Sequence, residues 1–181
     1  YNESGQWMNG PLRGYVYLLE NTGSNDNPVY NDPERLLNTD GDPVDVFGRP
    51  SPNFADYTGD GKLDLICGEF RDGFTFFKNT GTRNNPLYAP GRPLTNGDTL
   101  IRMDLCMITP VAYDFTGNGW PDLVVGDEDG RVALVEHSGE IVDGMPLFHP
   151  PRYFRQQADD VKFGPLGNPV VFDWYGSGRD A

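Results

Sequence analysis

The chain has 181 residues, of which 37% are hydrophobic and 13% aromatic, and this composition is typical of a folded globular protein. Its formal net charge of −13 disfavours nucleic acid and anionic membrane surfaces as partners, because both are themselves negatively charged. No apolar run approaches the length of a membrane span. We therefore expect no nucleic-acid partner and no membrane insertion.

An internal repeat organises the chain. The segment 53–81 recurs as 111–139, so that Asp56 is matched by Asp114 after 58 residues and by Asp173 after another 59. The 23 glycines and 16 prolines are spread along the chain, and they predict many tight turns between short strands. A supersecondary unit that repeats at such an interval is typical of solenoids and propellers.

In chain order, the repeat predicts a partial unit over 1–51, whole units over 52–109 and 110–168, and the start of another over 169–181. In the second unit we expect strands at PNFAD, LDLICGEF and FTFFKN, then an irregular outer segment leading through TLIRMDL. Segments such as LVVG and VALVE are apolar on both faces, which suits a sheet covered on both sides by neighbouring sheets.

These features predict an all-β fold, a β-propeller of four-stranded blades with a period of about 58 residues, of which this chain covers about three. The whole chain, 1–181, is expected to be part of a single propeller domain. Because a closed propeller has on the order of four to eight blades, we expect the remaining blades to belong to a larger chain.

Acidic loops follow the first strand of each unit. Oxygen ligands at alternate positions of a glycine-bent loop are what calcium requires. In the first loop the predicted ligands are Asp56, Thr58, Asp60, the backbone carbonyl of Lys62, and Asp64. In the second they are Asp114, Thr116, Asn118, the carbonyl of Trp120, and Asp122. The first loop, with three carboxylates, is the stronger calcium candidate.

Two alternatives apply to these loops. An EF-hand is excluded, because its twelfth position needs a bidentate Glu and helical flanks, whereas Cys67 and Val125 stand there within strand-like segments. The other alternative is that the acidic side chains only accept hydrogen bonds from turn amides, without metal. A third loop from Asp173 has Tyr175 at its third position and Asp180 one residue early, so we expect it to bind nothing.

The D-x-T-G-D-G-x-x-D-L loop, the glycine hairpin and the N-T-G turn together resemble VCBS/FG-GAP repeats. These repeats occur in secreted bacterial proteins, including those of polysaccharide utilisation, and more distantly in integrin α-subunit propellers. The resemblance covers essentially the whole chain. It implies an extracellular, cell-surface or periplasmic protein, with the acidic loops on one face of the propeller and ligand recognition on the other.

On that opposite face, the resemblance places hairpin tips and the crossings between units. The candidate ligand-binding residues there, all expected to be exposed, are Arg49, Glu69, Arg71, Asp72, Arg102, Asp127, Glu128 and Asp129. Acidic residues beside arginine suit sugar hydroxyls, and paired carboxylates are used in glycoside hydrolysis. The alternative is that these charges are simply solvated hairpin tips.

No spacing in the sequence specifies a reaction. A Ser-His-Asp order, a nucleophile elbow, a phosphate-binding glycine loop and a zinc motif are all missing, and the two histidines, His137 and His149, have no partner by spacing. The leading hypothesis is a calcium-stabilised module that binds polysaccharide or a protein partner through its loop face. The alternative is a polysaccharide lyase or glycoside hydrolase with its active centre opposite the calcium loops. Integrin-like adhesion is a third hypothesis.

Overall fold

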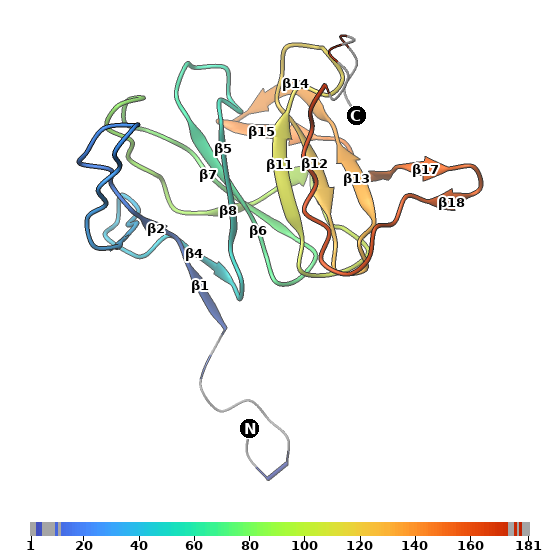
Figure 1. Ribbon diagram of the computed structural model, residues 1–181, viewed down its shortest axis with the longest axis horizontal. Helices are drawn as coiled ribbons and strands as arrows, with labels where there is room; N and C mark the ends of the chain where they lie inside the picture. The colour runs from blue at the N-terminus through green and yellow to red at the C-terminus, as the bar shows by residue number, and fades with distance from the viewer. Residues whose placement is uncertain (1–2, 5–9, 11, 174–175, 177, 179–181) are drawn as a thin grey trace.

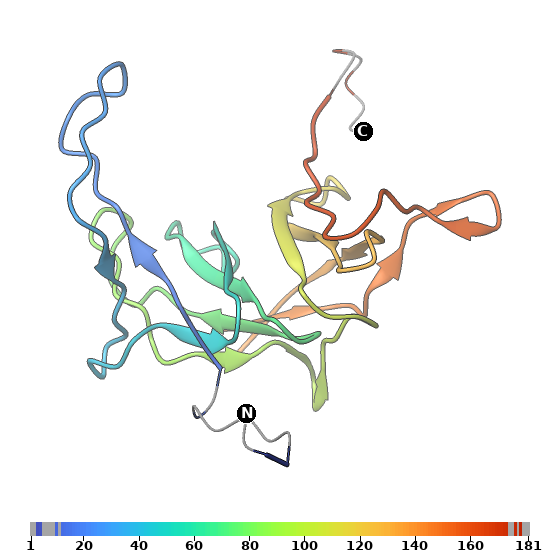
Figure 2. The ribbon, with the colours of Figure 1, turned by 60° about the horizontal axis from the view of Figure 1, so that its bottom comes forward.

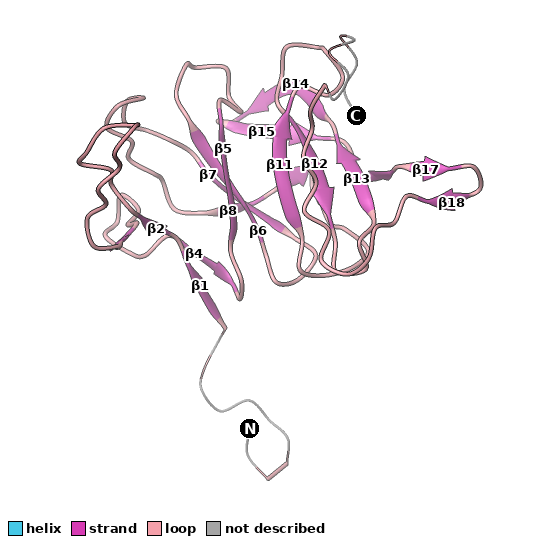
Figure 3. Cartoon of the chain, in the orientation of Figure 1, coloured by secondary structure: helices cyan, strands magenta, loops and turns pink. Residues whose placement is uncertain are grey.

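The computed structural model describes residues 3–4, 10, 12–173, 176 and 178 (Figure 1). Within that part of the chain every regular element is a β-strand and none is a helix (Figure 3). The prediction of an all-β fold is confirmed. Among these residues there is accordingly no helix long and apolar enough to cross a membrane. Of the third acidic loop, Tyr175 and Asp180 lie outside the described residues.

The N-terminal part consists of two small antiparallel sheets. Strand β1 (Arg13–Tyr15) pairs with β4 (Asp45–Phe47), and β2 (Tyr17–Leu18) pairs with β3 (Glu34–Arg35). They fall within the predicted partial unit, residues 1–51.

The middle sheet is four-stranded and antiparallel, in the order β5-β6-β7-β8. Its strands are β5 (Ser51–Ala55), β6 (Asp64–Gly68), β7 (Phe74–Phe77) and β8 (Arg92–Pro93). The first three lie where the repeat predicts them. The edge strand β8 is only two residues long, since Pro93 has no N–H to continue the ladder. The segment through TLIRMDL instead begins with β10 (Thr99–Leu100), which pairs with β9 (Thr95–Asn96).

The third sheet repeats the strand order of the middle sheet, as β11-β12-β13-β16. Its strands are β11 (Thr109–Tyr113), β12 (Asp122–Gly126), β13 (Val132–Val135) and β16 (Arg152–Tyr153). Ile66 pairs with Phe76 in the middle sheet, and Val124 pairs with Leu134 in the third, each 58 residues further on. The repeat in the sequence is therefore a repeat in the pairing register.

Two hairpins accompany the third sheet. Strand β14 (His137–Val142) pairs with β15 (Met145–Phe148), between β13 and β16 in the chain. Strand β17 (Arg155–Gln156) pairs with β18 (Asp159–Asp160), and this hairpin projects from the body of the molecule (Figures 1 and 2).

The main core lies between the middle and third sheets. The three parts of the chain lie side by side in chain order (Figure 2). The core side chains, all at most 7% exposed, come from both sheets: Tyr57, Ile66, Phe74, Phe76, Leu94, Ile101, Met103 and Ile108 precede Leu123, Val125, Ala133, Val135, Met145 and Phe148. A second cluster packs the middle sheet against the N-terminal part. Strand β6 lies between the two clusters and is therefore buried at all five positions. Burial of a large apolar side chain of this strand, such as Leu65 or Ile66, contributes roughly 1.5 to 3 kcal/mol.

Candidate functional site

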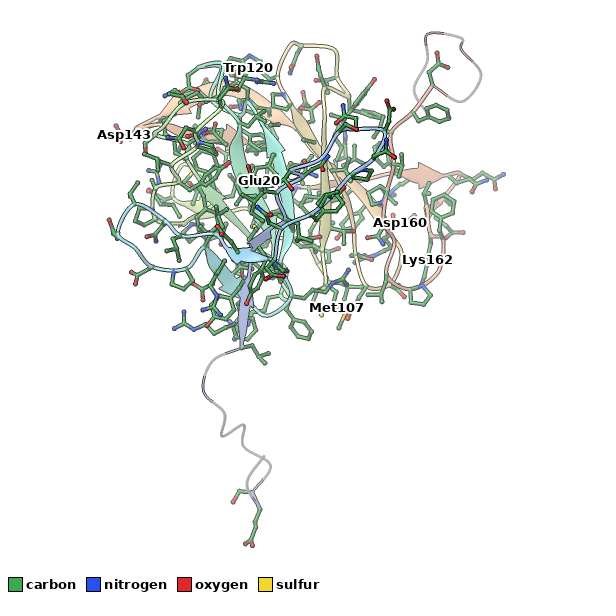
Figure 4. All side chains as sticks on the ribbon, turned by 60° about the vertical axis from the view of Figure 1, so that its left-hand side comes forward. Glu20, Met107, Trp120, Asp143, Asp160 and Lys162 are labelled. Atoms are coloured by element: carbon green, nitrogen blue, oxygen red, sulfur yellow. The ribbon has the colours of Figure 1, made fainter. Side chains whose placement is uncertain are left out.

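The predicted site residues lie at two opposite ends of the sheets. Because successive strands are antiparallel, the acidic loop between β5 and β6 and the hairpin between β6 and β7 are at opposite ends. Figure 4 shows Trp120, from the second acidic loop, far from Met107. The N–H of Met107 donates to the carbonyl of Phe70, which fixes this crossing segment beside the β6–β7 hairpin. We call the two regions the acidic-loop end and the hairpin end.

The first acidic loop is held by its own carboxylates. The Asp56 carboxylate accepts hydrogen bonds from the N–H groups of Asp60 (3.0 Å) and Gly61 (2.8 Å). Asp60 accepts one from the N–H of Lys62 (3.2 Å). Gly61 has a φ of 81°, a left-handed conformation that glycine adopts without strain. These contacts are those of the hydrogen-bonded turn that the sequence left open as an alternative.

The fully buried Asp64 closes the base of this loop. Its carboxylate accepts hydrogen bonds from the hydroxyl of Thr58 (2.9 Å) and the N–H of Asn79 (2.8 Å). Burial raises the pKa of Asp64, although both hydrogen bonds and the nearby Lys78 favour the ionised form. Asp64 thus connects the acidic loop to the end of strand β7.

A lysine ammonium group lies inside the first loop. Nζ of Lys78 donates to the hydroxyl of Thr58 (3.1 Å) and to the carboxylate of Asp60 (3.2 Å). Burial alone raises the pKa of Asp60, but the hydrogen bond from Lys78 and the one from the Lys62 amide outweigh it, and the pKa is lowered. Part of the negative charge of the loop is therefore balanced without a metal ion.

The second acidic loop repeats the same turn. Asp114 accepts hydrogen bonds from the N–H groups of Asn118 (3.0 Å) and Gly119 (2.9 Å), and the side-chain oxygen of Asn118 accepts one from the N–H of Trp120 (2.9 Å). Asp122 accepts from both the N–H (3.0 Å) and the hydroxyl (3.1 Å) of Thr116.

The charge next to the second loop is reversed. The N–H of His137 donates to Asp122, as that of Asn79 donates to Asp64, so the preceding residues Glu136 and Lys78 hold equivalent positions. At the position of the lysine whose ammonium group lies inside the first loop, the second unit therefore has a glutamate.

The oxygen donors of both loops are of the type that calcium prefers. Across the described ranges, however, no group of three or more His, Cys, Asp and Glu side chains is arranged to hold a metal ion. The carboxylates predicted to bind calcium accept hydrogen bonds from backbone N–H groups of the turns. Since a carboxylate oxygen has about two lone pairs, these bonds leave acceptor capacity for a cation.

His137 links the second loop to the first. Its buried ring stacks on Trp120 with centroids 4.8 Å apart, and its Nδ1 accepts a hydrogen bond from the N–H of Gly139 (2.8 Å). That acceptor role assigns the proton to Nε2, which donates to the carbonyl of Tyr57 (3.0 Å). Burial lowers the pKa of His137. The contact with Tyr57 joins residues 80 positions apart, which spacing in the sequence could not reveal.

At the hairpin end, Arg71, Arg102 and Glu69 line one pocket of about 130 Å³. The rest of its wall is Gly73, Phe74, Pro93, Leu94, Leu100 and Ile101. The guanidinium of Arg71 lies 4.1 Å from the ring centroid of Phe47. Arg102 pairs with Asp72, and the Thr75 hydroxyl donates to Glu69.

No family model, curated protein or solved structure matches this chain. The chemistry of the pocket is therefore the guide to its function. Two exposed guanidinium groups beside a partly buried carboxylate form a small polar site with an apolar floor. Arg49, also predicted here, is exposed on the link between β4 and β5, two residues beyond Phe47.

The equivalent hairpin of the third sheet is organised differently. The prediction of an exposed Asp127 is wrong: its buried carboxylate accepts hydrogen bonds from the N–H groups of Asp129 and Arg131 and from Nε of Arg131, each at 3.0 Å. Asp129 pairs with Lys162 at 2.6 Å. Glu128 is hydrogen-bonded to the thiol of Cys106 and thereby raises its pKa. The predicted charges of this hairpin are thus engaged with one another and with neighbouring side chains.

The hairpin pocket is therefore specific to the middle sheet. Asp129 and Lys162 occupy the positions equivalent to Arg71 and Arg102, since the N–H of Phe163 bonds to the carbonyl of Gly130 as that of Met103 bonds to Asp72. Arg71 and Arg102 are both ligand-binding candidates predicted from the sequence. The two come together because the crossing segment that carries Arg102 returns to the β6–β7 hairpin.

Proposed function

We propose that this chain is part of a secreted or periplasmic, calcium-stabilised β-propeller that binds polysaccharide through its hairpin end. The propeller assignment is supported by two sheets of the same four-strand order, packed face to face one repeat apart. Asn53 joins them, since its side chain donates to the carbonyl of Pro110 (3.2 Å) and accepts from the N–H of Ala112 (2.9 Å).

The observation that carries the binding function is the pocket shared by Arg71, Arg102 and Glu69. Arg71 rests on Phe47, and a stacked guanidinium keeps its in-plane N–H donors available to a ligand. Arg102 gives one of its nitrogens to Asp72 and keeps the others, so the two guanidinium groups together suit the carboxylate and hydroxyl groups of a uronate, and Glu69 provides an acceptor for a sugar hydroxyl. We therefore propose an acidic polysaccharide as the ligand.

Calcium is proposed at the acidic loops, where it would neutralise carboxylates and fix the turn. The first loop has three carboxylates, but the ammonium of Lys78 already compensates Asp60. The second loop has two carboxylates with Glu136 at the position of Lys78. Because the ammonium competes with a metal ion for the same oxygens, we now favour the second loop as the calcium site.

Calorimetric titration with a panel of neutral and uronate-rich polysaccharides tests the ligand. We expect binding only of uronate-rich polymers, weakened at least tenfold by either Arg71→Gln or Arg102→Gln. The matched control is Arg83→Gln, which removes an exposed arginine at the acidic-loop end, where its side chain donates to the carbonyl of Gly61. Equal binding by all three variants, or no binding by the parent, would remove this pocket from consideration.

The second candidate function is polysaccharide cleavage, favoured by the presence of Glu69 in the same pocket. The same panel, followed for unsaturated uronates and new reducing ends, tests it. Product that disappears with Glu69→Gln while binding persists would identify an enzyme. Binding without product supports the module.

A further inference from the structure

The outer face of the third sheet carries an apolar surface, which we call the terminal face. It surrounds a hollow of about 560 Å³. The terminal face is formed by Phe115, Val124, Val132, Phe154, Val161 and Phe163, with residues 167–171 along one side, and all of these residues line the hollow. Phe163 is 81% exposed and Val170 78%. Exposure of this extent is unusual for large apolar side chains grouped in one patch.

The middle sheet has the same face, and there it is covered. Backbone hydrogen bonds fix the equivalence: the N–H of Leu94 donates to the carbonyl of Phe74, and that of Phe154 donates to Val132. Likewise the N–H of Ile101 donates to Leu94 as Val161 donates to Phe154. Met107 and Leu166, which also correspond, both have a positive φ, of 53° and 61°. The two sheets therefore present matching surfaces.

The covered counterparts are almost inaccessible. Tyr57, Ile66, Phe74, Leu94, Ile101 and Met103, which match the six residues of the terminal face in order, are 0 to 3% exposed. Their cover comes from the third unit, which contributes Leu123, Val125, Val135 and Phe148 to the same core cluster. Within this chain, the face of the middle sheet is therefore covered by the next unit of the repeat.

The two outer hairpins follow the same rule. Strand β9 lies in contact with β15 of the next unit. The corresponding hairpin, β17–β18, extends outward past the edge of the third sheet (Figure 1). Of the six residues of the terminal face, five are exposed or partly exposed and only Val124, at its base, is buried, whereas all six of their counterparts in the middle unit are buried.

We propose that the terminal face is a docking surface for a further four-stranded unit of the same repeat, with residues 169–173 as its first strand. That unit would present apolar side chains at the positions of Leu123, Val125, Val135 and Phe148. The inference deepens the propeller part of the proposed function, on which it rests, and it is independent of the polysaccharide ligand.

The test adds a unit to the intact chain. Because Asp173 corresponds to Asp114, a copy of residues 115–168 follows Asp173 in place of residues 174–181, and Phe163→Cys is introduced in a Cys106→Ser background, where the other cysteine, Cys67, is buried. We expect the new thiol to react with a maleimide at least tenfold more slowly in the extended chain than in the 181-residue chain. In the matched control, the appended copies of Leu123 and Val125 are replaced by Asp, and fast labelling should return.

Equal labelling of the parent and of a cooperatively unfolding extended chain would overturn the proposal. Labelling that is already slow in the 181-residue chain, and becomes faster on dilution, would identify a second copy as the occupant instead. Unchanged uronate binding in all these proteins separates this result from the fate of the hairpin pocket.

A second measurement applies if the extended chain does not fold. In the 181-residue chain, Phe163→Ser should leave the melting temperature unchanged and reduce the fluorescence of a bound apolar dye. The equivalent Met103→Ser should lower the melting temperature clearly, because Met103 is 3% exposed. Equal losses for the two variants would show that Phe163 is already covered, and the proposal would be wrong.

Discussion

Replacing Lys78 by Met tests whether its ammonium group takes the part of a metal ion in the first acidic loop. Nζ lies 3.2 Å from the Asp60 carboxylate, where the Coulomb energy is roughly 5 kcal/mol at an effective dielectric constant of about 20 and roughly 1.3 kcal/mol in water. The two side chains are 27% and 32% exposed, so solvent screens much of this. We expect Lys78→Met to cost about 1 to 2 kcal/mol of unfolding free energy without calcium.

The same variant should respond to calcium. The loss corresponds to a melting temperature about 3 to 6 °C lower in chelator, given the size of the chain. With the ammonium removed, less of the negative charge of the loop is compensated, and calcium at about 100 times its dissociation constant would return roughly 2.7 kcal/mol. Thermal unfolding with and without calcium measures both effects. Lys62→Met is the control, since Nζ of Lys62 lies 3.6 Å from the Asp60 carboxylate, farther than Nζ of Lys78 at 3.2 Å. A Lys78→Met protein as stable as the parent, with no added calcium response, refutes this reasoning.

Three further predictions concern single positions. Glu136→Lys gives the second loop the residue of the first, and calorimetry should show that its calcium binding is abolished. The fold lowers the pKa of His137. Its contribution to stability is therefore fully present above the unfolded pKa of about 6.5 and is lost as pH falls through the lower folded pKa. His137→Asn, which copies Asn79, should flatten the dependence of melting temperature on pH over that window. Asp127→Ala leaves Arg131 without its buried partner and should cost about 3 kcal/mol in denaturant unfolding, whereas Asp129→Ala, whose side chain is 48% exposed, should cost under about 0.5 kcal/mol.

The fold was most predictable where the repeat and local chemistry agree. The strands β5 to β7 are apolar segments bounded by glycine turns, and the same pattern returns 58 residues later in β11 to β13. The edge strands β8 and β16 were not predictable, because two residues carry no alternation. Their pairing is decided by the sheet they join.

The site was less predictable than the fold. Sequence reasoning selected Arg71 and Arg102, which do line one pocket, but it gave Asp127 the same role. The hairpin pattern alone cannot show that Arg131 turns back onto Asp127 and buries it. Lys78 was missed as well. Aligning the two units could have found it, because Lys78 and Glu136 then occupy the same position beside otherwise similar loops.

The two whole units differ most at residues next to those whose hydrogen bonds hold the acidic-loop turns. Asp64 and Asp122 make the same hydrogen bonds at the loop base, so the scaffold is kept. One residue away from those bonds, lysine is exchanged for glutamate at 78 and 136. The hairpin end changes in the same manner, since the equivalents of its two pocket arginines are an aspartate and a lysine that pair with each other. On the proposals made above, a ligand at the hairpin end would therefore contact the middle unit, and the third unit would contribute the surface on which the next one packs.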